Sequence, residues 1–236
     1  MTEFRHEIPM RWADLDSLNH VNNVVYLEYA AQARAAAGVT GPIARTTIEF
    51  LRPLLLSRTP VEVVTRVEGT AVHQTIGVRG VPHEFARVEV LLGAPEPPPE
   101  PRPAPHRPAH AEPFVLRLTD IDRTGEVGDA QCFELFQEIR IPFIDATLDR
   151  LVPGRFVVGR VVVDHLRPIT YRAEPLATRT WISRVGGSSY TIHSQLLDES
   201  GVLAASSSVL VGFDLSTQRS RPLGDDERAR LTAAMD

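Results

Sequence analysis

The chain has 236 residues, enough for one large domain or two small ones, and its 43% of hydrophobic residues is ordinary for a soluble globular protein. Its 25 Lys and Arg against 30 Asp and Glu give a net charge of −5, which argues against a general nucleic-acid-binding protein because such proteins need a basic face. The single cysteine, Cys132, cannot form an internal disulfide, which suits a reducing cytoplasm. The first residues are too polar to resemble a signal peptide, and no apolar run approaches the ~20 residues of a membrane span. We therefore expect a cytoplasmic protein.

The first part of the chain predicts one helix and several strands. Residues 3–12 alternate weakly and indicate a strand. Residues 23–37 have apolar side chains at helical spacing, with several alanines that leave one face small, and Gly38 suits the position just beyond a helix end. Segments rich in Val, Ile, Thr or Phe then predict strands at 43–52, 61–70, 71–79 and 85–92. One helix followed by a run of antiparallel strands is an α+β pattern.

Proline dominates residues 94–113, where we expect an extended, solvated spacer rather than a helix or a sheet strand. A docking site for a polyproline-binding partner is the alternative, although a linker explains the composition without one.

The sequence of the first half recurs after this spacer. At a shift of 106 residues, Arg11-x-x-Asp14-x-Asp16 matches Arg117-x-x-Asp120-x-Asp122. At a shift of 115 residues, Leu51-Arg52-Pro53 matches Leu166-Arg167-Pro168. Such self-similarity predicts two copies of one unit, which we assign to residues 1–93 and 114–236 with a linker at 94–113.

The second unit repeats the order of elements. We expect a helix near 129–141 that breaks or kinks at Pro142, and a hairpin turn at Gly186-Gly187. Residues 224–235 predict a short amphipathic helix. Strands are expected near 156–168, 176–185, 189–197 and 202–213.

Residues 11–26 carry the chemistry of the candidate site and read R-W-A-D-L-D-S-L-N-H-V-N-N-V-V-Y. We interpret them as a polar loop that leads into the start of a helix, with Asn22 or Asn23 as the N-cap. The free N–H groups of the first turn and the helix dipole would stabilise an oxyanion or a polarised carbonyl. A carboxylate nearby could act as nucleophile or general base.

The motif R-W-x-D-x-D-x-x-x-H-V-N-N-x-x-Y resembles the acyl-CoA thioesterases of the hotdog-fold family, the group that includes 4-hydroxybenzoyl-CoA thioesterase. The resemblance implies hotdog units, each a curved antiparallel sheet wrapped around a central helix, which pair so that the active sites lie between them. Two units in one chain would then form a tandem double hotdog, an intramolecular pseudo-dimer. Where the family usually has Gly before His-Val-Asn-Asn, this chain has Asn19, which tolerates a left-handed backbone better than most residues.

The resemblance assigns the catalytic carboxylate, as nucleophile or base, to Asp16. The alternative is a carboxylate that only shapes the loop. Asp14 is expected to be structural. His20 could orient a water, donate to the thioester carbonyl, or bond loop carbonyls, and these roles remain open.

The start of the helix is expected to polarise the thioester carbonyl. The backbone N–H groups of Asn23 and Val24 are the candidate donors, while the side chains of Asn22 and Asn23 would cap the helix and could also hold the attacking water. We assign Tyr26 to substrate binding. Arg52 and Arg167 are also candidate substrate-binding residues, which either bind CoA phosphates or brace the interface.

A second site would centre on Asp122. There His-Val-Asn-Asn is replaced by Glu126-Val127-Gly128-Asp129, and the added carboxylates would repel an anionic substrate and a hydroxide. We expect this site to be weak or inactive, with catalysis by Asp122 as the contrary hypothesis.

We therefore expect an acyl-CoA thioesterase that releases a free acid and CoA, with no metal and no cofactor besides the CoA of the substrate. Its partner would be a small-molecule acyl thioester rather than nucleic acid or membrane, and the double-hotdog chains could form a homo-oligomer. A hotdog enoyl-CoA hydratase or dehydratase and a non-catalytic acyl-CoA binding protein are the alternatives.

Other chemistries find little support in the sequence. The chain contains no G-x-S-x-G elbow of a serine hydrolase and no glycine-rich phosphate-binding loop, and prolines prevent a helical metal site at His106 and His110.

Overall fold

The structure is a computed structural model that describes residues 3–94, 110–148 and 154–235. By its internal contacts the chain divides into two compact units, Met1–Pro95 and Glu96–Asp236. Within the described ranges, none of the helices is both long enough and apolar enough to cross a membrane.

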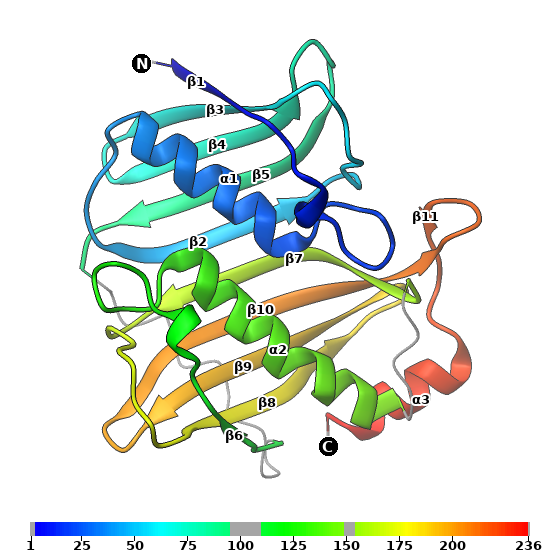
Figure 1. Cartoon of the computed structure of the whole chain (residues 1–236). Helices are drawn as coiled ribbons and strands as arrows, with labels where there is room; N and C mark the ends of the chain where they lie inside the picture. Colours follow the sequence, from blue (N-terminus) through cyan, green and yellow to red (C-terminus); the bar gives the residue numbers. More distant parts are fainter. Residues whose placement is uncertain (1–2, 95–109, 149–153, 236) are drawn as a thin grey trace. The chain divides into compact units, whose positions relative to one another are not determined.

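The first unit is a five-stranded antiparallel sheet with one helix lying across it (Figure 1). The strand order is β1-β3-β4-β5-β2, and every neighbouring pair is antiparallel. The elements are β1 (Glu3–Ile8), the 3₁₀ turn η1 (Trp12–Asp14), α1 (Asn23–Ala36), β2 (Ile43–Phe50), β3 (Val61–Glu68), β4 (Ala71–Val78) and β5 (Glu84–Leu92).

Small side chains let α1 approach this sheet closely. Leu27, Ala30 and Ala33 are fully buried on one face of the helix, while Ala35 and Ala36 face solvent. The strands present alternating side chains, so their buried sets form the other wall of the core. The predicted helix with one small face is therefore confirmed. It ends at Ala36 with Ala37 as its C-cap, and Gly38 follows with a φ of +71°, which is easily adopted only without a side chain.

The core of the first unit also contains a buried cation that the sequence did not reveal. Arg34 is 5% exposed and donates to Gln74 Oε1 at 2.9 Å. The amide of Gln74 donates in turn to Ala30 O at 2.9 Å and to Thr65 Oγ1 at 3.0 Å. This network ties the helix to β3 and β4, because a buried polar group left without a partner would destabilise the fold.

The second unit repeats the arrangement with a longer helix (Figure 1). Its strand order is β7-β10-β9-β8-β6, with β11 beside β10. The elements are β6 (Pro113–Phe114), the 3₁₀ turn η2 (Leu118–Asp120), α2 (Asp129–Leu148), β7 (Phe156–His165), β8 (Leu176–Val185), β9 (Ser189–Asp198), β10 (Gly201–Asp214), β11 (Arg219–Ser220) and α3 (Asp225–Ala233).

The predicted helix bounds of 129–141, with a break at Pro142, are wrong, because α2 continues through this residue to Leu148. The alternative of a kink at Pro142 stays a prediction. Proline removes one helical hydrogen bond and costs roughly 3 kcal/mol in a helix interior. Beyond it, Phe143, Ile144 and Leu148 are buried in a cluster with strands β8 to β10 and α3. Burial of each large apolar side chain contributes about 1.5–3 kcal/mol, so together they outweigh the proline.

The predicted spacer at 94–113 is only partly open to comparison, since residues 95–109 lie outside the described ranges. Its last residues do pair with a strand, contrary to the prediction. His110 and Thr180 exchange backbone hydrogen bonds of 3.0 and 2.9 Å, and Pro113 pairs with Ala177 of β8. β8 is otherwise an outer strand with unpaired backbone groups, and an edge strand can accept proline where its missing N–H is not required.

Each unit is thus an antiparallel sheet with a central helix, and the predicted α+β class is confirmed. The pairing of the two units into a pseudo-dimer stays a prediction.

Candidate active site

The loop before α1 is a short hairpin that presents Asp16. Leu15 and Val21 form an antiparallel bridge, and Asp16 N donates to His20 O at 2.8 Å. Asn19 turns the chain with a φ of +58°, so the predicted left-handed residue is confirmed. The loop geometry is therefore fixed by its own backbone.

Asp16 is half-buried, and one of its carboxylate oxygens anchors the hairpin. Oδ1 accepts the backbone N–H groups of Leu18 at 2.8 Å and His20 at 3.0 Å. Among the residues that the structure describes, Oδ2 has no hydrogen-bond partner. The loop-shaping role and the chemical role are thus compatible, because one oxygen holds the carboxylate in place while the other stays available.

The helix start has one occupied donor and one open donor. Asn22 is the N-cap, and its side-chain oxygen accepts Val24 N–H at 3.0 Å, so the predicted cap is confirmed. Val24, a candidate oxyanion donor, is therefore engaged by the cap. The N–H of Asn23, the first helical residue, has no acceptor within the described ranges. Asn23 is the better placed of the two to bind an oxyanion.

Asp14 holds the other side of the loop. Its Oδ2 accepts Arg11 N–H and the hydroxyl of Tyr29, both at 2.6 Å, and its carbonyl accepts Asn22 N–H at 2.8 Å. The structural role predicted for Asp14 is confirmed. The sequence reading missed Tyr29, although its position two turns into the helix and facing the loop could have suggested it. Burial, and then the bond to Asp14, raise the pKa of Tyr29.

The segment after β2 closes the loop from the opposite side. Val21 N donates to Leu54 O at 2.8 Å, and His20 forms a bridge with Leu55. Leu54 N donates to the hydroxyl oxygen of Tyr26 at 2.9 Å. The imidazole of His20 has no hydrogen bond to the described residues, so its role is not fixed by the fold.

The second unit builds the same loop, which supports the predicted repeat. Asp122 N donates to Glu126 O at 2.8 Å, and Gly125, with a φ of +88°, occupies the turn position that Asn19 has in the first unit. Val127 N donates to Ile169 O at 2.8 Å, as Val21 does to Leu54.

The two loops differ in how they present the second Asp. Asp122 is exposed, and its Oδ1 accepts both N–H and O–H of Thr124, at 2.7 and 2.6 Å. The bond from the Thr124 hydroxyl is the main cause that lowers the pKa of Asp122. The residue that corresponds to Tyr26 is Cys132, whose pKa burial raises to about 12, so its thiol stays protonated and unreactive. The second loop is therefore less suited to basic or nucleophilic chemistry.

Arg52 and Arg167, the arginines of the two Leu-Arg-Pro segments, lie in different surroundings. Arg167 donates to both carboxylate oxygens of Asp198 and to the carbonyls of Gly201 and Val202, at 2.6 to 3.3 Å. This arrangement favours a bracing role at the β9–β10 turn over the substrate-binding role predicted for Arg167. Arg52 is exposed, and its guanidinium forms no ion pair within the described ranges.

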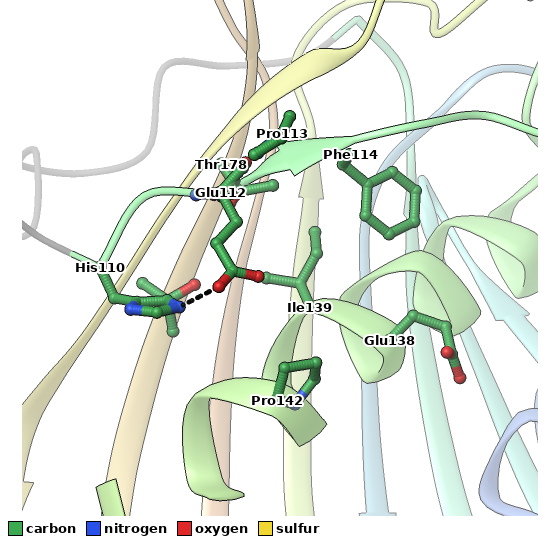
Figure 2. Close-up of a pocket in the computed structure, with 9 residues that line it drawn as sticks. His110, Glu112, Pro113, Phe114, Glu138, Ile139, Pro142 and Thr178 are labelled. Atoms are coloured by element: carbon green, nitrogen blue, oxygen red, sulfur yellow. Dashed lines mark hydrogen bonds and ion pairs between the residues drawn. The ribbon is translucent and has the colours of Figure 1, made fainter. Parts of the chain in front are cut away.

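Two pockets lie within single units, and both are too small for an acyl chain. Figure 2 shows the one between α2, β6 and β8, where His110 Nε2 lies 3.2 Å from Glu112 Oε1 and the pair faces Ile139 and Pro142. Its volume is about 40 Å³, and the other, beside the β4–β5 turn, measures about 130 Å³. Sites for drug-sized ligands usually exceed ~300 Å³, so these pockets hold water or small ions at most.

Among the described residues, no group of three or more His, Cys, Asp or Glu side chains could hold a metal ion. The sequence pair His106 and His110 is not comparable, because His106 lies outside those residues.

Two thioesterase family models match the chain. Residues 116–231 match a model described as the Thioesterase-like superfamily, and residues 1–71 match the Acyl-ACP thioesterase C-terminal domain. No curated protein matches the sequence.

Solved structures share the fold at low sequence identity. A putative oleoyl thioesterase from Lactobacillus plantarum is 11% identical with a TM-score of 0.67, covering 90% of this chain and 97% of that one. The 12:0-ACP thioesterase from Umbellularia californica is 11% identical with a TM-score of 0.62 and 94% of both chains covered. A hot dog fold protein of unknown function from Alicyclobacillus acidocaldarius is 13% identical with a TM-score of 0.58, covering 90% and 93%. The predicted hotdog fold is confirmed, and the first two of these structures are named as thioesterases other than 4-hydroxybenzoyl-CoA thioesterase.

Proposed function

Because two thioesterase family models match this chain and it shares the hotdog fold, we propose that it hydrolyses an acyl thioester to a free acid and a thiol, with Asp16 as the reacting carboxylate. The observation that carries the proposal is the pairing of a half-anchored carboxylate with an open helix N–H. Asp16 Oδ2 and Asn23 N–H both lack a partner in the described residues. An acyl carbonyl needs both groups, a base or nucleophile for its carbon and a donor for its oxygen.

Asp16 acts through its free oxygen. As a general base, Oδ2 takes a proton from water while the water oxygen attacks the thioester carbon; the C–S bond then breaks, and the leaving thiolate takes up this proton. As a nucleophile, Oδ2 attacks the carbon and expels the thiolate, which takes a proton from solvent, and water then cleaves the mixed anhydride to give the free acid and restore the Asp16 carboxylate. In both routes the backbone bonds to Oδ1 keep the carboxylate in one orientation, which lowers the entropic part of the barrier.

Negative charge on the carbonyl oxygen is stabilised by Asn23 N–H and the positive end of α1. Removal of one such donor typically costs ~10²–10³ in rate. Val24 contributes less, because its N–H donates to Asn22.

The carrier of the acyl group is a phosphate-bearing thiol, and Arg52 is the residue we assign to its phosphate. Exposure and the lack of an ion pair in the described chain support this role for Arg52, since a free guanidinium binds phosphate well. We propose CoA as the carrier. Acyl carrier protein is the second candidate, favoured by the match of residues 1–71 to an acyl-ACP thioesterase model.

We assign the reaction to the first unit and expect little from Asp122. The exposure of Asp122, its bond from the Thr124 hydroxyl and its lowered pKa support this difference. The cytoplasmic location and any assembly of chains remain part of the proposal, and neither metal nor redox chemistry is needed for this hydrolysis.

The first test measures thiol release and hydration side by side. A panel of acyl-CoAs of increasing chain length is assayed for free thiol, and crotonyl-CoA is assayed for loss of its double bond. The proposal predicts thiol release without hydration. Hydration without thiol release would favour the hydratase, and tight acyl-CoA binding with no turnover, unchanged in Asp16→Ala, would favour a non-catalytic binder.

The second test addresses the carrier. Arg52→Ala should raise KM for acyl-CoA by roughly threefold to tenfold, because an exposed phosphate contact is lost. Arg58→Ala is the matched control, since Arg58 is exposed and unpaired in the described chain and lies in the same segment. An N-acetylcysteamine thioester of the same acyl group has no phosphate and should be insensitive to both variants. An equal effect of Arg52→Ala on this short substrate would contradict the phosphate assignment.

A further inference from the structure

The hydroxyl of Tyr26 lies at the candidate site, although the residue belongs to the helix core. Tyr26 is 2% exposed, and its ring meets that of Phe50 edge to face at 5.3 Å. Side chains on a helix lean toward its N-terminus, so a residue in the first turn of α1 directs its hydroxyl back toward the loop. The hydroxyl oxygen there accepts Leu54 N–H at 2.9 Å.

Leu54 connects this hydroxyl to the Asp16 hairpin. Its carbonyl accepts Val21 N–H at 2.8 Å, and the adjacent His20 donates its own N–H to Asp16 Oδ1 at 3.0 Å. Burial is the main cause that raises the pKa of Tyr26 to about 12, and the charge of Asp16 adds to it. The hydroxyl therefore stays protonated and lies within electrostatic reach of the carboxylate.

The proton of this hydroxyl has no acceptor in the described part of the chain. The bond to Leu54 uses a lone pair of the oxygen and leaves the O–H free to donate. Buried donors are nearly always hydrogen-bonded, because an unmade bond costs about 1–3 kcal/mol. An O–H held in place by Leu54 and left unpaired is a donor ready for a ligand.

The second unit shows that this hydroxyl is not needed to build the loop. Cys132 takes the place of Tyr26, and Ile169 takes the place of Leu54. Val127 N still donates to Ile169 O at 2.8 Å, as in the first unit. The loop and its closing segment thus form without a tyrosine, and the tyrosine accompanies the loop whose Asp is half-buried rather than exposed.

We infer that Tyr26 is a further catalytic residue, whose O–H donates to the thioester oxygen together with the N–H of Asn23 as negative charge develops. This inference rests on the proposed hydrolysis. The second oxyanion donor is then the side chain of Tyr26, because the neighbouring backbone N–H, that of Val24, already donates to Asn22 Oδ1. Such a donor acts mainly on the transition state, because the carbonyl oxygen is only weakly charged in the bound substrate.

The test compares Tyr26→Phe with wild type on an acyl thioester that wild type hydrolyses. We expect kcat to fall by roughly 10²–10³ with KM changed less than threefold. Tyr190→Phe is the matched control, because it removes another buried hydroxyl, one without a partner, from the second unit. Tyr190→Phe should keep the wild-type kcat.

A pair of analogues separates catalysis from a purely structural effect. A trifluoromethyl ketone analogue of the acyl-CoA, which forms an oxyanion on addition of the nucleophile, should bind Tyr26→Phe more weakly by the same factor as kcat/KM. A non-hydrolysable thioether analogue, which forms none, should bind both proteins alike. Equal weakening of both analogues, or a kcat within twofold of wild type, would overturn the inference.

Tyr26→Cys is the second variant, since the other unit carries Cys at the same position and folds around it. It should show the same loss as Tyr26→Phe. Failure of wild type to hydrolyse any acyl thioester would instead refute the proposed function, which is a distinguishable result.

Discussion

The side chain of Asn22 could act only as a helix cap or could also hold the attacking water, and the variant Asn22→Ala distinguishes these two roles. In Asn22→Ala the Val24 N–H loses its acceptor at 3.0 Å, while the backbone bond from Asn22 N to Asp14 O remains possible. Loss of an N-cap costs about 1 kcal/mol, within a range of 0.5–2. For a unit of about one hundred residues this corresponds to a fall in Tm of roughly 4–8 °C.

Activity gives the second readout of the same variant. If Asn22 is only a cap, the kcat of folded Asn22→Ala should stay within about fivefold of wild type, because Asp16 and the N–H of Asn23 are untouched. Asn22→Ser is the control, since serine also caps helices but has no amide, and it should recover most of the lost Tm. Calorimetry and thiol release measure the two effects. An unchanged Tm would refute the cap, and a hundredfold loss of kcat in both variants would show that the amide takes part in catalysis.

Three further predictions concern the second unit. Pro142→Ala restores a backbone N–H donor for the carbonyl of Glu138 and should raise the free energy of unfolding by roughly 1–3 kcal/mol. Urea titration measures this change, and a destabilised variant would contradict the account of α2. Hydrogen bonds, chiefly from Arg221, lower the pKa of Glu227 from 4.5 to about 2. The ionised carboxylate therefore stabilises the fold above pH 4.5, and this contribution is lost as the pH falls toward 2. Wild type should therefore lose roughly 3 kcal/mol more than Glu227→Gln over this range, and equal pH dependence would refute it. Cys132, fully buried with a raised pKa, should react with a thiol reagent only after unfolding, and rapid labelling of the native protein would contradict its burial.

The sequence predicted the regular parts of the fold because their signals are local. Alternating strands, the alanine-rich face of α1 and the turn residues Asn19 and Gly38 each follow from a short pattern. The repeat predicted a second copy of the loop, and the structure forms it with corresponding backbone bonds from Asp122, Gly125 and Val127.

The errors came from interactions between distant segments. Pro142 predicts a helix end locally, yet the apolar residues beyond it are buried against strands that start many residues later. In the same way, residues 110–113 look like part of a proline-rich spacer until the free edge of β8 is known. Composition alone cannot say which edge a segment will meet.

The candidate site was predicted in its residue types but not in its bonding. The motif indicated Asp16 and the helix start, whereas only coordinates show that Val24 N–H is engaged and that Arg167 is bound to Asp198. Tyr26 was assigned to substrate binding, but the direction of its free O–H depends on Leu54, which is distant in sequence.

The most direct test of the central claim compares two single substitutions in thiol release. Asp16→Asn keeps the size of the side chain and one oxygen for the loop amides but removes the base, so kcat should fall by roughly 10²–10⁴. Asp122→Asn should leave kcat within a few-fold of wild type. Full activity in Asp16→Asn, or a loss confined to Asp122→Asn, would contradict the assignment of the reaction to the first unit.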